Sequence, residues 1–220
     1  MNRALHRPTP DSSILVYVDY VTGLDNLMNR LPTRVYKNNI AAFAKLNPLF
    51  KLPTVVLGEE SEYYGTFLPE IAHVTHDVRR YGRTQISGFV PEFRDWLAST
   101  GRTDVIIGGI SLDNCVLHTS LDLLREGYNV FVVVDVSGTN SPITEEVAMM
   151  RLRDAGAVMC TWLSIATELG VDFASPYGDG MKAIIGTHWP ASTVGPVDDS
   201  TPDGHGMGLP QEARSEQPAV

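Results

Sequence analysis

Cysteine is scarce in this chain of 220 residues, which contains only Cys115 and Cys160. Two cysteines cannot form the disulfide framework of a small secreted protein, and their scarcity favours a reducing compartment. Residues 1–10 are polar and lack the apolar run of a signal peptide. No stretch approaches the ~20 apolar residues of a membrane-spanning helix. These absences predict a soluble cytoplasmic protein that has no membrane partner.

Positive charge is also in short supply. The chain has 17 Lys and Arg residues against 26 Asp and Glu residues, which gives a formal net charge of −9. A protein that binds nucleic acid needs a basic surface for the phosphates, so we expect no nucleic-acid partner. The apolar fraction of 43% is ordinary for a globular protein that buries a core.

Several common site motifs are missing as well. The first apolar run is followed by Asp-Tyr-Val-Thr-Gly instead of a Gly-x-Gly-x-x-Gly phosphate loop, and no Walker A pattern occurs. Residues 109–113 lack the last glycine of a serine nucleophile elbow. His73 and His76 have a spacing that a helix could use for metal binding, but no further His cluster or Asp-x-His accompanies them. We therefore predict no metal site and no cofactor.

Short apolar runs alternate with amphipathic stretches along most of the chain. The runs are rich in Val and Ile and show no polar alternation, which is typical of strands buried on both faces; they cover residues 13–18, 53–57, 103–107, 129–134 and 157–160. Helical spacing of apolar residues marks the segments between them, residues 35–51, 90–99, 114–126 and 144–154. Gly127 and Gly156 predict the ends of the last two helices.

Alternating strands and helices at this spacing predict parallel strands joined by right-handed crossovers. The expected fold is a three-layer α/β/α sandwich with a doubly wound, mainly parallel sheet, formed by residues 1–175. Residues 176–220 are rich in Gly and Pro and acidic, which favours an irregular tail, with one short element at residues 181–185. An arm that lies on a neighbouring subunit is the alternative for this tail.

Polar residues directly after the predicted strands are the first candidates for a site, because ligands bind beyond the carboxyl ends of parallel strands. Asp19 follows the first strand. Ser111, Asp113, Asn114 and Cys115 follow the strand at residues 103–107, and a further group follows the next strand, namely Asp135, Ser137 and Thr139.

Cys115 stands out in this group, because two glycines end the preceding strand and place the cysteine in the first turn of a helix. Unpaired N–H groups and the helix dipole lower the pKa of a thiol at such a position and can hold an oxyanion. Asp19 could orient or deprotonate this thiol and protonate a leaving group. A buried apolar cysteine and a helix N-cap are the structural alternatives for the two residues. Cys160, in an apolar run, is expected in the core.

The pattern resembles the isochorismatase-like cysteine hydrolases, and within them the YcaC-type branch. Four segments carry the resemblance, in family order from about residue 12 to residue 173: ILVYVDYVTGL, VYKNNI, DVIIGGISLDNCV and DVSGTNSPITEEVAMMRLRDAGAVMCTWLSIATEL. The resemblance implies a catalytic triad of an aspartate, a basic residue and a cysteine, in which Asp19 and Cys115 take two positions.

The basic residue of the triad is lysine in most members of the family, but this chain has no lysine between Lys51 and Lys182. The family places this residue shortly before a turn that Ser87-Gly88-Phe89 resembles. Arg83 is the best match and Arg80 the second. Arginine stays charged and cannot shuttle protons, but its cation lowers the pKa values of neighbouring acids and thiols.

The resemblance also implies a non-proline cis peptide ahead of the cysteine, which falls at Ile110–Ser111 in this chain. The backbone N–H groups of Ser111 and Cys115 would then form the oxyanion hole. Large ring-shaped or stacked homo-oligomers are common in the YcaC branch, so the resemblance implies self-association.

These observations lead to the hypothesis of a hydrolase that cleaves a carbon–nitrogen bond in a small amide through a covalent acyl-enzyme. Asp19 would take the thiol proton, Cys115 would attack and Arg83 would hold the ion pair. Two alternatives stay open: vinyl-ether hydrolysis as in true isochorismatases, and an idle scaffold or binding subunit on the same fold. Four aromatic residues are candidates for the pocket or for the core, namely Tyr20, Tyr63, Tyr64 and Phe89.

Overall fold

The computed structural model describes residues 5–75 and 78–192. Six parallel strands form one sheet in the order β3-β2-β1-β4-β5-β6. The strands are β1 (Ser13–Val18), β2 (Thr54–Leu57), β3 (Arg79–Tyr81), β4 (Asp104–Gly109), β5 (Asn129–Val133) and β6 (Val158–Cys160). This confirms the predicted fold class and the five strands predicted from apolar runs.

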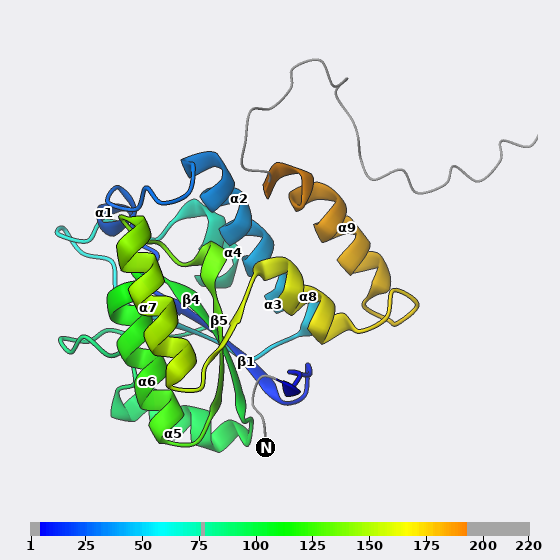
Figure 1. Cartoon of the computed structure of the whole chain (residues 1–220). Coiled ribbons are helices and arrows are strands. Elements are labelled where there is room, and N and C mark those ends of the chain that lie inside the picture. Colours follow the sequence, from blue (N-terminus) through cyan, green and yellow to red (C-terminus); the bar gives the residue numbers. More distant parts are fainter. Residues whose placement is uncertain (1–4, 76–77, 193–220) are drawn as a thin grey trace, which may run out of the picture.

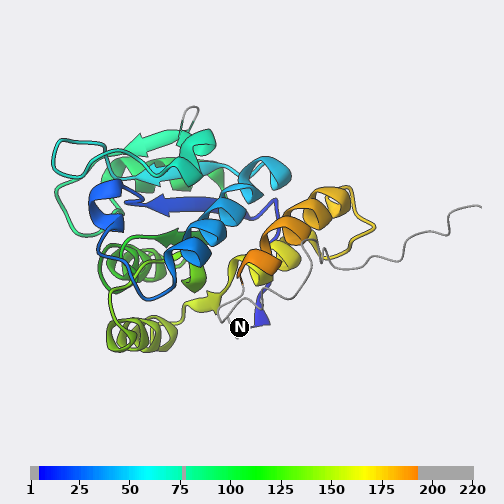
Figure 2. The same cartoon turned by 90° about the horizontal axis from the view of Figure 1, so that it is seen from above.

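Helices cover both faces of the sheet (Figures 1 and 2). One face carries α5 (Pro91–Thr100), α6 (Leu117–Arg125) and α7 (Pro142–Asp154), and the other carries α2 (Thr33–Ala44), α3 (Leu46–Phe50), α8 (Trp162–Gly170) and α9 (Gly178–His188). Short elements complete the described chain: α1 (Thr22–Asp25), η2 (Pro69–Ile71), α4 (Ala72–Thr75), the π-turn η3 (Leu112–Val116), η4 (Val134–Val136) and η5 (Pro190–Ser192).

The two faces of the sheet have separate apolar cores, and alternate residues of one strand supply them. In β1, Ile14 and Val16 pack with the α5–α7 layer, while Leu15 and Tyr17 pack with the α2–α9 layer. This is the two-residue period of a strand with both faces buried. The continuous apolar runs therefore predicted these strands correctly.

The predicted helix at residues 35–51 is in fact two helices, α2 and α3, and Pro48 gives the reason. Proline has no N–H to donate to the carbonyl four residues earlier, which belongs to Ala44. In the structure His73 Nε2 donates to this carbonyl oxygen at 3.2 Å instead. His73 thus has a structural partner, and His76 lies outside the described residues.

Strand β3 has no counterpart among the predicted elements. It is three residues long, its Arg79 and Arg80 are exposed, and it lies at the edge of the sheet. A polar edge strand lacks the apolar run by which a buried strand is identified. The helix α8 is also additional to the predicted elements; it starts with a capping box between Thr161 and Ser164.

The helix α9 lies within the segment that the sequence marks as tail. Its residues Met181, Ile184 and Ile185 are buried in the same core as α2 and α8. The structure therefore places a packed helix where the sequence predicts one short element. Residues 193–220 lie outside the described residues, and an irregular acidic tail stays a prediction for them. Among the described residues, no helix is long and apolar enough to cross a membrane.

Candidate active site

Asp19 and Cys115 follow neighbouring strands in the middle of the sheet. Asp19 comes directly after β1, and Cys115 lies in η3, which follows β4. From β1 the strand order runs through β2 and β3 on one side and through β4, β5 and β6 on the other, so β1 and β4 flank the topological switch point. This is where ligands bind in an open parallel sheet.

The backbone holds Asp19 in an unusual conformation at the end of β1. Its φ angle is +48°, in the left-handed region, and its N–H donates to the carbonyl oxygen of Leu57 at 2.8 Å. Gly58, at the end of the neighbouring strand, leaves room for the carboxylate. A Cβ atom on Gly58 would lie 2.4 Å from Asp19 Oδ1.

Arg83 is the partner of Asp19. Its Nη1 donates to Oδ1 at 2.9 Å and its Nη2 to Oδ2 at 2.5 Å, so the pair is bidentate. Both side chains are largely shielded from solvent, with exposures of 6% for Arg83 and 12% for Asp19. Arg80, the second candidate for the basic position, instead lies over the ring of Phe67, 5.4 Å from its centroid.

The Arg83 guanidinium is fixed on a second side as well, because its Nε donates to the Ile86 carbonyl oxygen at 3.4 Å. Burial lowers the pKa of Arg83, but the hydrogen bonds and charges of Asp19 and Cys115 outweigh this effect and raise the pKa above its ordinary value. The site therefore holds a permanent cation that cannot donate a proton.

The Cys115 thiol lies within hydrogen-bonding reach of both Asp19 and Arg83, so the three residues of the expected triad converge. Burial raises the pKa of this thiol to about 12, with a further contribution from the Asp19 charge, and the Arg83 cation only partly offsets these effects. The expectation of a lowered pKa at the helix start is therefore wrong. Desolvation and the neighbouring carboxylate outweigh the dipole of the helix.

A cis peptide bond and a single π-helical turn, which contains Cys115, follow β4. The peptide bond Ile110–Ser111 is cis, at the position implied by the family resemblance. The Leu112 N–H donates to the Gly138 carbonyl oxygen at 2.9 Å. The Val116 N–H donates to the Ser111 carbonyl oxygen at 3.1 Å, and this second hydrogen bond closes the π-turn that contains Cys115. The nucleophile candidate thus lies in a backbone turn that contacts both β4 and the segment after β5.

A pocket of about 520 Å³ opens above Asp19, Arg83 and Cys115. Its other walls come from the segments after β1, β2 and β3 and from the π-turn: Val21, Leu24, Gly58, Glu59, Tyr64, Thr84, Gln85, Ile86 and Asn114. A cavity of this size accommodates a small-molecule substrate. No motif in the sequence identifies Gly58 or Glu59 as residues that line this pocket.

The four aromatic candidates occupy different environments in the structure, and only one of them lines the pocket. Tyr64 lines the pocket, whereas Tyr63 is 84% exposed on the loop beside it. Tyr20 is fully buried, and its hydroxyl donates to the Val136 carbonyl oxygen at 2.8 Å. Phe89 packs edge-on against Phe93 of α5, with 5.7 Å between ring centroids.

The polar residues after β5 have structural partners. Asp135 Oδ1 accepts the N–H of Trp162 at 2.8 Å at the start of α8, and burial raises the pKa of Asp135 to about 6. The Ser137 hydroxyl donates to the Val133 carbonyl oxygen at 2.7 Å. Neither residue lines the pocket above Cys115. In the described part of the chain, no group of three or more His, Cys, Asp or Glu residues is placed to hold a metal ion.

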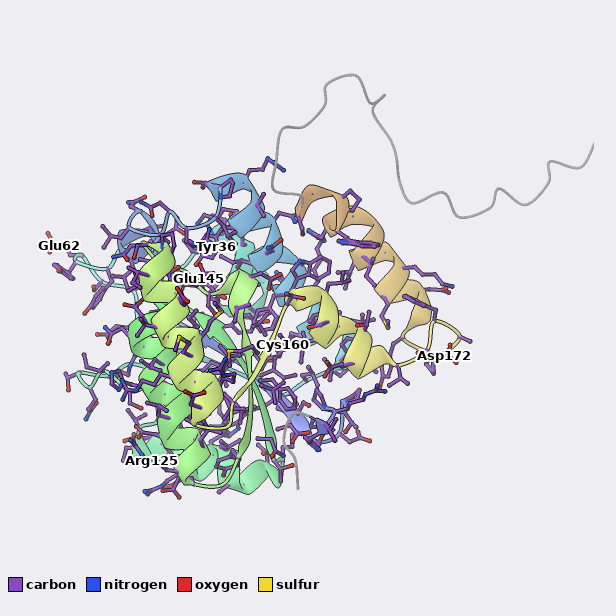
Figure 3. All side chains as sticks on the ribbon, viewed as in Figure 1. Tyr36, Glu62, Arg125, Glu145, Cys160 and Asp172 are labelled. Atoms are coloured by element: carbon purple, nitrogen blue, oxygen red, sulfur yellow. The ribbon has the colours of Figure 1, made fainter. Side chains whose placement is uncertain are left out.

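The core prediction for Cys160 is confirmed, since this residue is buried and its thiol donates to the Val132 carbonyl oxygen at 3.4 Å. Both cysteines are free thiols. Cys160 is the last residue of β6, and its label in Figure 3 lies close to the start of α8.

Comparison with solved structures supports the same fold. The structure of YcaC from Pseudomonas aeruginosa with hexane-2,5-diol and covalent acrylamide has a TM-score of 0.81 and 31% sequence identity, covering 86% of this chain and 94% of that one. YcaC from Escherichia coli, described as an octameric hydrolase of unknown specificity, has a TM-score of 0.80 and 31% identity, covering 84% and 92%.

Sequence comparison agrees. The chain is 33% identical over 183 residues to the probable hydrolase YcaC of Escherichia coli, covering 82% of this chain and 87% of that protein. It is 29% identical over 191 residues to the secreted isochorismatase effector Isc1 of Phytophthora sojae, covering 84% and 90%. The family model of the Isochorismatase domain matches residues 34–164. The chain therefore belongs to the isochorismatase family and is of the YcaC type.

Proposed function

We propose that the chain is a cysteine hydrolase that cleaves the carbon–nitrogen bond of a small amide through a covalent acyl-enzyme. The observation that carries the proposal is the convergence of the Cys115 thiol, the Asp19 carboxylate and the Arg83 guanidinium at the base of one pocket. The relatives support a hydrolase activity without specifying the bond, since the YcaC protein of Escherichia coli is named a probable hydrolase.

The raised pKa of Cys115 determines the order of events at the thiol. The sulfur stays protonated until a substrate arrives, so the proton must leave as the carbon–sulfur bond forms. Asp19 is the base within hydrogen-bonding reach of this thiol. Arg83 keeps both carboxylate oxygens oriented and stabilises the negative charge as it moves from the carboxylate to the sulfur.

In the acylation step Cys115 Sγ attacks the amide carbon while its proton moves to Asp19. The carbonyl oxygen becomes an oxyanion, held by the backbone N–H groups of Ser111 and Cys115. As the tetrahedral intermediate collapses, the carbon–nitrogen bond breaks and Asp19 returns the proton to the departing amine. Water, deprotonated by Asp19, then attacks the thioester and releases the acid and the thiol.

A covalent acrylamide is present in the related structure from Pseudomonas aeruginosa. Acrylamide combines an amide with a carbon–carbon double bond to which thiols add, so it resembles the proposed substrates and can also trap a nucleophilic thiol. It is therefore a suitable probe for Cys115 in this chain.

The proposal is tested by turnover of a panel of small amides, combined with intact-mass detection of an acyl-enzyme. Cys115→Ala and Asp19→Asn are expected to lower kcat by at least ~10³-fold, because they remove the nucleophile and the base. Cys160→Ala is the matched control and should keep activity. Arg83→Lys, which introduces the residue that the family resemblance implies at this position, should keep part of it. Full turnover by both Cys115→Ala and Asp19→Asn would refute the mechanism.

We also propose that the chain forms a homo-oligomer. The related Escherichia coli YcaC is octameric, and α7 of this chain exposes an apolar row in which Ile143 is 65%, Val147 56% and Met150 47% exposed. Val147→Glu should reduce the mass measured by sedimentation, whereas Val171→Glu, at an exposed site outside this row, should not. A wild-type mass equal to that of one chain at micromolar concentration would refute the proposal.

The cytoplasm is the proposed location, because a catalytic thiol has to stay reduced and both cysteines are free. Cell fractionation with an antibody against the chain tests this. Recovery of the protein mainly from the extracellular fraction would contradict it.

A further inference from the structure

Four consecutive strands each present one charged or nucleophilic residue at the same edge of the sheet. In the spatial order β3, β2, β1 and β4, these residues are Arg83, Glu59, Asp19 and Cys115. Three of them form the proposed triad, and all four line the pocket. Glu59 follows Gly58, whose N–H donates to the Tyr81 carbonyl oxygen at 2.9 Å, so neighbouring strands hold its backbone in place.

The carboxylate of Glu59 has no role in the triad, and no basic side chain in the described part of the chain forms an ion pair with it. Its Oε2 lies 2.6 Å from the position that a Cβ on Gly82 would take, so it crosses over the residue that precedes Arg83. Arg83 is the only basic residue that lines the pocket in the described part of the chain, and both of its Nη groups are bound to Asp19.

A second cavity adjoins the pocket, and its lining also contains more acidic than basic residues. Both cavities are lined by Glu59, Arg83, Thr84 and Gln85, and the second one also reaches Glu92 at the start of α5. Carboxylates thus outnumber cations along the whole opening. A carboxylate-bearing substrate would be repelled there, whereas a cation would be attracted.

We infer that Glu59 selects substrates by charge and that the pocket takes small amides carrying a protonated amine or a guanidinium. This inference rests on the proposed function and specifies its substrate class. The cationic group of the substrate interacts with the Glu59 carboxylate while the amide carbon lies at Cys115. The ring of Tyr64, on the pocket wall, offers a face on which the same cation packs.

The sheet sets the length of such a substrate. Neighbouring strands lie about 4.8 Å apart, so the ends of β2 and β4, two strands apart, are separated by about 10 Å. The Glu59 side chain extends towards Gly82, which follows β3, and therefore does not shorten this span. The substrate therefore has several bonds between its amide carbon and its cationic nitrogen, as in the amide of an ω-amino acid.

The test uses two thiol probes that share a reactive group and differ in charge: 2-(trimethylammonio)ethyl methanethiosulfonate and 2-sulfonatoethyl methanethiosulfonate. Each forms a disulfide with the cysteine and releases methanesulfinate. The ratio of their rates at Cys115, followed by peptide mass spectrometry, cancels the intrinsic reactivity of this thiol. It therefore reports the charge of the pocket whether or not Cys115 is catalytic, and failure of this inference is distinguishable from failure of the proposed function.

The cationic probe is expected to react faster, and Glu59→Gln should lower the ratio about fivefold at low ionic strength, as a unit charge ~8 Å away does in water. Glu62→Gln removes the same charge from a loop that extends away from the body of the protein (Figure 3), outside the lining of the pocket, and should change the ratio less than twofold.

Three outcomes would overturn the inference: a faster anionic probe, equal effects of Glu59→Gln and Glu62→Gln, or no labelling of Cys115 by either probe. Equal effects would mean that the net charge of −9 acts as a whole. Among the amides that the enzyme hydrolyses, those with an ammonium group should have the higher kcat/KM, and Glu59→Gln should reduce this preference mainly through KM.

Discussion

Gly58→Ala should inactivate the site without touching any member of the triad. The added Cβ would lie 2.4 Å from Asp19 Oδ1, about 1 Å closer than ordinary van der Waals contact. Arg83 holds both oxygens of this carboxylate, so Asp19 cannot move aside without losing at least one of the two hydrogen bonds. A displacement of ~1 Å in a catalytic group lowers the rate by about 10²-fold.

The backbone adds a cost to stability. Gly58 has a φ of +119°, where an L residue is strained, and an alanine in a left-handed conformation costs roughly 1–2 kcal/mol. Gly101→Ala is the matched control, because Gly101 has a φ of +67° and a Cβ there would meet nothing within 4 Å. Gly101→Ala should lose about 1–2 kcal/mol of unfolding free energy and Gly58→Ala at least as much, but only Gly58→Ala should lose activity.

Urea unfolding gives the two stabilities, and turnover of an amide substrate gives the two activities. Acrylamide adduct formation at Cys115 serves as a second readout if no substrate has been found. If Gly58→Ala kept activity within twofold of the wild type, the position of Asp19 would not matter for the reaction. If Gly101→Ala lost as much activity as Gly58→Ala, the loss would be an effect of stability, and the steric reasoning would be refuted.

Three further predictions concern ionisation and helix capping. Because the Cys115 thiol has a raised pKa of about 12, its alkylation by iodoacetamide should rise about tenfold per pH unit from pH 8 to 11, while buried Cys160 stays unreactive; a plateau below pH 8 would contradict this. The raised pKa of Asp135, about 6, means that the native state holds this proton more tightly than the unfolded chain, so its contribution to stability is lost as the pH rises through 6. Asp135→Asn should therefore raise the unfolding free energy by about 3 kcal/mol at pH 8 and leave it unchanged below pH 4, since the amide oxygen still accepts the Trp162 N–H; equal effects at both pH values would argue against a buried carboxylate. Thr161→Ala, which removes the cap of α8, should cost about 1 kcal/mol in urea unfolding, and a neutral result would show that this cap is dispensable.

Local sequence predicts most of the fold because the central strands are buried on both faces. Ser13–Val18 and Asp104–Gly109 consist almost entirely of buried apolar residues and glycine, so their ends are visible in the sequence, and with them Asp19 and Cys115. Strand β3 is the opposite case. Its arginines are exposed at the sheet edge, and it becomes a strand only by pairing with β2.

The residues around Asp19 show where sequence reasoning ends. Arg83 follows a strand that no apolar run marks, so only the family resemblance favours it over Arg80; in the structure Arg83 pairs with Asp19, whereas Arg80 lies over Phe67. Gly58 and Glu59 belong to no motif at all. Both residues follow β2, and they line the pocket because β2 pairs with β1, which carries Asp19. This strand order is a property of the whole fold and cannot be read from local sequence.

The ionisation of Cys115 could not be predicted from the sequence for a related reason. Its place in the first turn after β4 indicates a lowered pKa, because the dipole and the free N–H groups of a helix start favour a thiolate. Burial and the carboxylate of Asp19 act in the opposite direction, and their strength depends on how closely three separate segments pack. The same packing gives the thiol its base: Asp19 raises the pKa of Cys115 because it is close enough to remove the proton. A high resting pKa is therefore compatible with the proposed nucleophile, provided that proton transfer and attack occur together.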